Sequence, residues 1–193
     1  GWVASSEKFW EPISKYINHF KIRGSYGLVG SDAFASGAPH FLYQNNIGIG
    51  SAHKFWTGLP TSEISKQGPG FYVLAVQDAG WEHVKKFDIG FDMMLFNQLN
   101  ITFDYFHDKR ERILMSRASW PSMLGYWGSK PWSNIGEVEN QGFELSLNWT
   151  KQFGKDLTLD LRGNFTYNQN EYKYVDEPSY PYVWQTNTGK PLN

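Results

Sequence analysis

Five histidines and a group of carboxylates are the residues of this sequence that could support acid–base or metal chemistry. The histidines stand at positions 19, 40, 53, 83 and 107, and no pair has the His-x-x-x-His spacing of a metal site. The sequence contains no cysteine, which excludes disulfides, thiolate ligands and cysteine nucleophiles. Residues 48–51 (GIGS) lack the rest of a phosphate-binding loop, and no Gly-x-Ser-x-Gly motif is present. We therefore predict no metal site, no cofactor and no catalytic residues, and a protein that is not an enzyme.

The carboxylates have a second interpretation. Asp88, Asp92 and Asp104 could pair as general acid and base, but basic residues occur at the matching positions of other segments. We interpret the whole set as a solvated wall of compensating charges on the wet face of a sheet. Its members are Lys21, Arg23, Asp88, Asp92, Asp104, Glu144, Asp160 and Arg162.

Aromatic residues in the irregular segments are the candidates for ligand contact. Aromatic residues make up 18% of the sequence, and such enrichment is typical of sugar-binding surfaces and of membrane-interface girdles. Their faces stack on sugar rings, and the tips of Trp and Tyr hydrogen-bond. The alternative is that these side chains only pack the loops. The candidates are Trp56, Trp120, Tyr126, Trp127, Trp132 and Trp184.

The segment at residues 142–150 indicates which kind of element positions these side chains. Its sequence, GFELSLNWT, alternates strictly between apolar and polar residues. A period of two predicts a strand with one face in an apolar medium and one face in water. Glycines at positions 136 and 142 predict a bend or a bulge where this strand leaves a loop.

Four further segments alternate in the same way. They predict strands at residues 20–29, 87–95, 99–105 and 156–168. Short turns at 96–98 and 151–155 join them, whereas residues 30–83, 108–135 and the tail after 169 show no sustained period. Near the N-terminus, residues 7–17 predict a short amphipathic helix that Pro12 kinks or divides into two turns. That helix is either a capped connector or an interfacial helix at a membrane edge.

The lengths of the connections favour a transmembrane β-barrel. Strand parity places every short connection at one end and every long one at the other, which is typical of outer-membrane barrels with short periplasmic turns and long extracellular loops. The apolar face then meets lipid, and the charges listed above face the lumen. Five strands cannot close a barrel, because about eight are the minimum. We therefore expect residues 1–193 to be a fragment of a larger barrel domain.

A soluble antiparallel sheet is the competing interpretation, as a β-rich glycan-binding module or adhesin that uses its aromatic loops. The two interpretations differ in the surroundings of the apolar face. A sandwich packs this face against a second layer, whereas a barrel leaves it as a bare band. The diagnostic residues are Ile89, Phe91, Leu145, Leu147 and Leu159. The net charge of −1 gives no reason to expect a nucleic-acid partner.

Three motifs resemble those of one known family. Residues 20–32 (FKIRGSYGLVGSD) are similar to the "LKLRASYGxTGN" strand of SusC/RagA-type TonB-dependent outer-membrane transporters. Residues 81–92 (WEHVKKFDIGFD) resemble that family's "WExxxxxNIGLD", and residues 134–144 (NIGEVENQGFE) resemble its "NxGxVxNxGxE". The motifs follow the family's order, with Val29, Asp32 and Asp88 where Thr, Asn and Asn are usual.

The resemblance implies a location in the outer membrane of a Gram-negative bacterium, and a 22-stranded barrel around a plug. It also implies that residues 1–193 are a fragment of this barrel domain, from which the plug domain and the final barrel strands are absent. It further implies coupling to TonB through a region outside this sequence, a SusD-like surface lipoprotein as partner, and oligosaccharides or peptides as cargo. In this interpretation the chain supplies barrel wall and extracellular loops to an importer of large nutrients.

Overall fold

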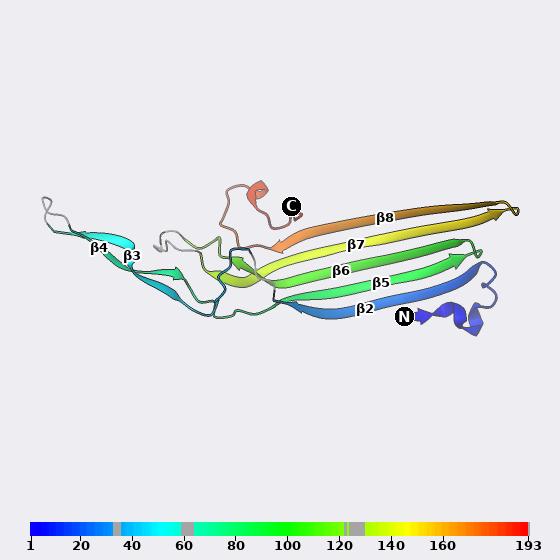
Figure 1. Ribbon diagram of the computed structural model, residues 1–193, viewed down its shortest axis with the longest axis horizontal. Coiled ribbons are helices and arrows are strands. Elements are labelled where there is room, and N and C mark those ends of the chain that lie inside the picture. Colours follow the sequence, from blue (N-terminus) through cyan, green and yellow to red (C-terminus); the bar gives the residue numbers. More distant parts are fainter. Residues whose placement is uncertain (33–35, 59–63, 122, 124–129, 193) are drawn as a thin grey trace.

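One antiparallel sheet dominates the computed structural model, which describes residues 1–32, 36–58, 64–121, 123 and 130–192 (only the backbone at 50–55). The sheet has six strands in the order β1-β2-β5-β6-β7-β8, and a separate two-stranded sheet, β3-β4, extends beyond one end (Figure 1). The strands are β1 Trp2–Val3, β2 Ile17–Ser31, β3 Asn46–Thr57, β4 Ile64–Val73, β5 Glu82–Leu95, β6 Leu99–Ser116, β7 Trp132–Phe153 and β8 Leu157–Tyr174. The all-β prediction is confirmed.

The short connections all lie at one end of the sheet, as parity predicts. The turns between β5 and β6 and between β7 and β8 lie beside the β1–β2 connector, and the long connections lie at the opposite end (Figure 1). In the tighter turn the N–H of Gln98 donates to the carbonyl of Leu95, and both central residues, Phe96 and Asn97, have φ of 54°. Positive φ at both central positions matches the right-handed twist of the adjoining strands.

The register separates two faces, because directly paired residues in neighbouring strands share a face. One row runs through Ile22, Phe91, Phe103, Leu145 and Phe165, across all five long strands. Among the described residues no second sheet or helical layer covers this face, and Ile89, Leu159 and Leu161 are 45%, 40% and 53% exposed. The bare band expected of a barrel wall is therefore present, and the sandwich alternative is wrong.

The predicted strand boundaries are too short at the end that carries the long loops. Residues 108–116 belong to β6, residues 132–135 belong to β7 and residues 169–174 belong to β8, although the sequence predicts loops there. Residues 136–141, between the predicted loop and the predicted strand, also belong to β7. Pairing continues through rows such as Lys85–Lys109–Glu139–Glu171, which share a face with Ile22. At this end of the sheet the residues on both faces are polar. The alternation of apolar and polar residues that predicts the strands therefore disappears, although the backbone hydrogen bonds between the strands continue.

Two other predictions are modified. Residues 7–17 do not form a continuous helix: two 3-10 turns, Ala4–Ser6 and Lys8–Trp10, are followed by further turns before β2. Trp132 is not a loop residue but the first residue of β7. It packs against a small buried core of Leu42, Val76 and Leu114 at the loop end. Among the residues that the structure describes, we find no helix with the length and hydropathy to cross a membrane.

Candidate functional site

The eight charged residues singled out in the sequence share one face of the sheet. Arg23, Gly90, Asp104 and Glu144 are directly paired across four strands, so their side-chain positions share one face. Lys21, Asp88 and Asp92 lie two residues from members of this row and therefore point to the same face. Asp160 and Arg162 join through their pairing with Thr150 and Asn148. All eight therefore lie opposite the apolar band.

Arg23 is the centre of this polar face. Its Nη2 donates a hydrogen bond to Asp104 Oδ2 at 2.9 Å, and its Nε lies 3.1 Å from Asp92 Oδ2 as an ion pair. Gly90 stands between Arg23 and Asp104 in the row. A Cβ there would lie 2.5 Å from the carbonyl oxygen of Phe103 and closer still to the Asp104 carboxylate. The glycine therefore opens the space through which the carboxylate reaches the guanidinium two strands away.

Gly142 has a similar role one row nearer the loop end. Its partner in β6 is Phe106, and a Cβ at Gly142 would lie 2.7 Å from Cζ of that ring. An aromatic ring that covers a cross-strand glycine compensates for the missing side chain. Of the two glycines that the sequence predicts to mark a bend or a bulge, Gly136 lies at a register shift between β6 and β7, which fits that prediction. Gly142 instead lies where the pairing of β7 is continuous, and gives room to this ring.

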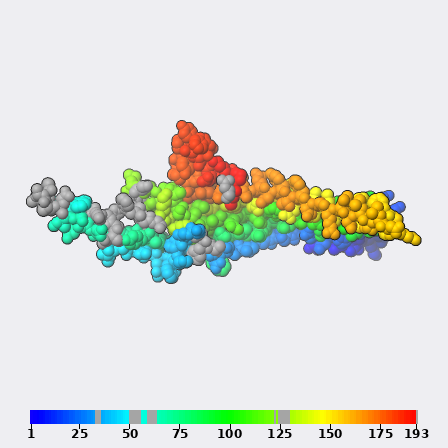
Figure 2. All heavy atoms as spheres, turned by 45° about the horizontal axis from the view of Figure 1, so that its top comes forward, coloured from blue at the N-terminus to red at the C-terminus, as the bar shows by residue number. Residues whose placement is uncertain are grey.

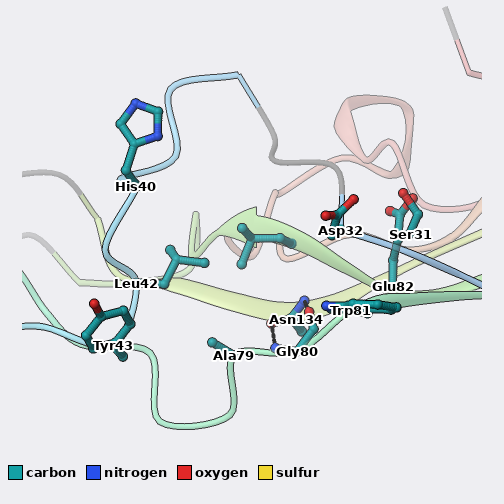
Figure 3. Close-up of a pocket in the computed structure, with 11 residues that line it drawn as sticks. Ser31, Asp32, His40, Leu42, Tyr43, Ala79, Gly80, Trp81, Glu82 and Asn134 are labelled. Carbon is teal, nitrogen blue, oxygen red and sulfur yellow. Dashed lines mark hydrogen bonds between the residues drawn. The ribbon is translucent and has the colours of Figure 1, made fainter.

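A cavity of about 360 Å³ lies at the loop end of the sheet (Figure 3). The ends of the three sequence motifs meet there, because their strands finish or begin at this edge. Ser31 and Asp32 end the first motif, Trp81 and Glu82 begin the second, and Asn134 begins the third. The remaining lining residues are His40, Leu42, Tyr43, Ala79, Gly80 and Leu114.

Asn134 holds one wall of this cavity in place. Its side-chain Nδ2 donates to the carbonyl of Gly80 at 2.9 Å, and its Oδ1 accepts from the N–H of Gly80 at 3.2 Å. The same Nδ2 donates to the carbonyl of Arg112 at 2.9 Å. Arg112 has φ of 60° at a bulge in β6, a conformation that costs free energy for a residue with a side chain. One asparagine thus joins the segment before β5 to the bulge.

Trp81 supplies the large aromatic surface at the cavity. It is 64% exposed, and Cε3 would lie 2.9 Å from a Cβ built on Gly30. Figure 3 shows its ring beside Glu82 and Asn134. Tyr43 and His40 lie in the segment on the other side of the cavity. An exposed indole near carboxylates and a histidine could stack on a planar or sugar-like group and hydrogen-bond its polar atoms.

The predicted aromatic contacts lie elsewhere. None of the four described candidates (Trp56, Trp120, Trp132, Trp184) lines this cavity. Trp56 is exposed on β3, Trp120 is partly buried, Trp132 packs on the small core, and Trp184 stacks on Tyr182 with ring centroids 5.9 Å apart. Tyr126 and Trp127 lie outside the described residues. Trp81 and Tyr43 line the cavity but are not among the predicted candidates. Only Trp81 had a signal in the sequence, because it begins the second motif.

A second cavity, of about 270 Å³, lies on the polar face nearer the loop end. The N–H of Leu192 donates to Asn170 Oδ1 at 3.0 Å and brings the C-terminal segment against it. The sequence does not predict this cavity, because its residues come from five separate segments that only the register of the sheet brings together. The residues that line it are Val84, Lys86, Asp108, Arg110, Val138, Asn140, Asn168, Asn170 and Leu192.

Asp176 fastens the C-terminal segment to the β6–β7 connection. Its carboxylate, 5% exposed, accepts from the N–H of Ser119 at 3.0 Å and from Ser119 Oγ at 2.8 Å, and Arg117 Nε lies 3.3 Å away. Burial by itself raises the pKa of this carboxyl. The hydrogen bonds from Ser119 and the charge of Arg117 outweigh burial and hold the pKa below its ordinary value. In the space-filling view this segment, in orange to red, projects from the sheet (Figure 2).

Within the described part of the chain, no group of three or more histidines and carboxylates is arranged to hold a metal ion. The candidate site consists of the charged sheet face, the cavity at the loop end and the exposed ring of Trp81.

Comparisons with known proteins give the same result. Residues 10–193 match the family described as "TonB dependent receptor-like, beta-barrel". TonB-dependent receptor P3 of Formosa agariphila is 30% identical over 171 residues, which are 88% of this chain and 16% of that protein. TonB-dependent receptor SusC of Bacteroides thetaiotaomicron is 26% identical over 183 residues, covering 89% and 16%. A structure of the RagAB peptide importer in the "open-open" state has a TM-score of 0.63 at 20% identity, covering 90% of this chain and 17% of that chain.

The sheet has the fold of a segment of a β-barrel wall, and proteins of the matched family lie in the outer membrane of Gram-negative bacteria. The chain belongs to the TonB-dependent receptor β-barrel family and is of the SusC/RagA type. It spans 16% of the length of the two curated relatives named above.

Proposed function

We propose that this chain forms part of the wall and the external loops of a TonB-dependent importer of large nutrients. The observation that carries the proposal is the separation of the two sheet faces. Uncharged apolar residues form a bare band on one face, and eight charged residues lie on the other. A charge in the lipid-facing band would cost roughly 2–4 kcal/mol at the bilayer midplane, so this separation suits lipid on one side and a wet lumen on the other.

The partners follow from the relatives. The RagAB structures are titled as those of a peptide importer and a peptide transporter, and SusC is named a TonB-dependent receptor. By analogy we propose energy coupling through TonB outside this chain and a SusD-like lipoprotein at the external face. The proposed cargo is an oligosaccharide or a peptide.

The cavity at the loop end is the place where we propose that cargo touches this chain. Trp81 and Tyr43 offer aromatic faces, while Asp32, Glu82 and His40 offer polar groups that can bind hydroxyls or amides. Because the cavity lies where the long loops begin, a solute that approaches from outside meets it before the sheet face.

Removal of the Trp81 ring tests this proposal. Trp81→Ala should weaken cargo binding by roughly 1 kcal/mol, or about fivefold in Kd, because one aromatic stacking surface is lost. Trp56→Ala is the matched control, because Trp56 is also 64% exposed but lies on β3 away from the cavity. Binding of an oligosaccharide library and of a peptide library is measured by calorimetry with the membrane-extracted protein. Equal losses in both variants, or none in Trp81→Ala, would count against the cavity.

A further inference from the structure

The connector between β1 and β2 folds back over the apolar face at the short-turn end of the sheet. β1 pairs with β2 through Trp2 and Ile22, and the chain then makes its two 3-10 turns. Trp10 stacks on Phe20 with ring centroids 5.3 Å apart and an interplanar angle of 6°. Phe20 in turn packs against Phe91, which belongs to the apolar row. The connector therefore covers the side of the sheet that we propose to face lipid.

Ring contacts continue from this connector across the sheet. After Phe91, the rings of Phe103, Phe143 and Phe165 follow, with successive centroids 5.5 to 6.0 Å apart. Trp10 is thus the first member of one aromatic stripe that runs from the connector to β8. Because the stripe is continuous, the medium that bathes the band also reaches the connector.

The outer surface of the connector is apolar, although none of the residues that the structure describes covers it. Phe9 is 59% exposed and Tyr16 is 55% exposed, and both belong to the connector, which lies at the same end as the short turns (Figure 1). Exposed apolar area costs roughly 25 cal/mol per Å² in water, so a cluster of this kind favours a non-aqueous neighbour. We call the set the connector surface: Trp2, Phe9, Ile13, Tyr16 and Phe96, of which each is at least 42% exposed.

Hydrogen bonds hold this surface against the sheet. Trp10 Nε1 donates to the carbonyl of Ile17 at 3.0 Å, and the N–H of Phe96 donates to the carbonyl of Tyr16 at 2.9 Å. The N–H of Asn97 donates to Asn18 Oδ1 at 2.6 Å. The connector is thus attached to β2 and to the β5–β6 turn. These attachments hold the exposed rings in a fixed position relative to the apolar band.

We propose that the connector surface is a membrane anchor that lies in the headgroup region of the phospholipid leaflet at the short-turn end. Continuity with the apolar band supplies the argument, and the proposal rests on the proposed function in that it takes the band to face lipid. Aromatic rings prefer the boundary between acyl chains and headgroups. The exposed Lys8 and Lys15 are balanced by the exposed Glu7 and Glu11, so the rings and not the charges carry the argument. The anchor fixes the depth of the sheet in the bilayer.

Depth-dependent fluorescence quenching tests the anchor. The protein extracted from membranes, with any partner subunits, carries a single bimane label at Phe9→Cys or, separately, at Ile13→Cys, and is placed in phospholipid nanodiscs. Residues 1–193 contain no cysteine that would compete for the label. Leu145→Cys marks the band, and Ser146→Cys marks the opposite face. Nitroxide-labelled lipids carry the quencher either at the headgroup or deep in the acyl chain.

We expect headgroup-labelled lipid to quench Phe9→Cys and Ile13→Cys more strongly than deep-labelled lipid does, with the reverse order for Leu145→Cys. Quenching of Leu145→Cys without any loss of fluorescence at Phe9 and Ile13 overturns the anchor and leaves the proposed function intact. That outcome would result if a second copy, a plug or a lipoprotein covered the connector. Absence of quenching at Leu145 as well overturns the proposed function itself.

Discussion

At the scale of single residues, the polar face depends on where side chains are missing as much as on where they are present. Arg23 and Asp104 belong to strands that are not neighbours, and they meet because Gly90 in the intervening strand has no side chain. Gly142 likewise admits the ring of Phe106. The charged residues could be predicted from their parity, but the sequence does not show which of them touch, because contact depends on register.

Gly90→Ala should destabilise the protein by about 1–3 kcal/mol, because the new methyl group would overlap the Phe103 carbonyl and displace the Asp104 carboxylate. The urea midpoint of unfolding, measured in lipid vesicles, reports the change. Gly27→Ala is the matched control, since nothing lies within 4 Å of a Cβ at that position. An equal shift in both variants would mean that loss of glycine itself, rather than overlap at Gly90, is responsible.

Asp176 should make the attachment of the C-terminal segment sensitive to acid. Its pKa lies below the ordinary value of 3.8, so its contribution is complete above that value and is lost as the pH falls through the lowered pKa. We expect a spin label at Val183→Cys to become more mobile below about pH 4. Adding Asp176→Asn should weaken the attachment by about 1–3 kcal/mol at neutral pH and remove this pH dependence. A label whose mobility has the same pH profile in both proteins would contradict this assignment.

At the scale of elements, the strands run farther than their apolar alternation. Near the short turns the sequence alternates because one face of the sheet is apolar. Nearer the long loops, rows such as Lys85–Lys109–Glu139–Glu171 are polar, and cross-strand ion pairs such as Lys85–Glu111 accompany the backbone pairing. Backbone hydrogen bonds between strands need no hydrophobic pattern. The sequence therefore predicts the strands but not where they end on the side of the long loops. The short turns are the opposite case, since their lengths alone identify them.

The β5–β6 turn allows a local test of this. Asn97 has φ of 54°, which asparagine and glycine tolerate and a β-branched residue does not. Asn97→Val should cost roughly 1–2 kcal/mol of unfolding free energy, whereas Asn97→Gly should be neutral or stabilising. Both variants keep the backbone N–H that donates to Asn18, so the comparison isolates the backbone conformation. Equal stability of the two variants would refute the left-handed turn.

At the scale of the whole molecule, the sheet has the features of a wall between two media. Its apolar face is bare, its opposite face is charged, and its long connections gather at one end, where the external cavity and the C-terminal segment lie (Figures 1 and 2). A soluble sandwich would have covered the band. In the proposed function, the bare face meets lipid, the charged face meets the solute, and the end with the long connections forms the external loops.

An arginine placed on each face distinguishes the two media. Leu145→Arg, in the middle row of the band, should cost roughly 2–4 kcal/mol and reduce the folded fraction recovered from membranes. Ser146→Arg is the adjacent residue on the charged face, and we expect a change within about 0.5 kcal/mol. Heat-modifiable migration on gels and urea unfolding in vesicles measure both. Similar tolerance of the two substitutions would contradict a lipid-facing band.

The sequence by itself determined the all-β class, the two faces, the short-turn end and the family resemblance. Each of these depends on local order: a period of two, the length of a turn, or a run of neighbouring residues. The tertiary structure alone decided which residues form the external cavity. Ser31, Trp81 and Asn134 are far apart in the chain and meet only because strand direction and register bring three motif ends to one edge. The loop aromatics predicted for ligand contact had no such constraint, because nothing periodic fixes the position of a residue in a long loop.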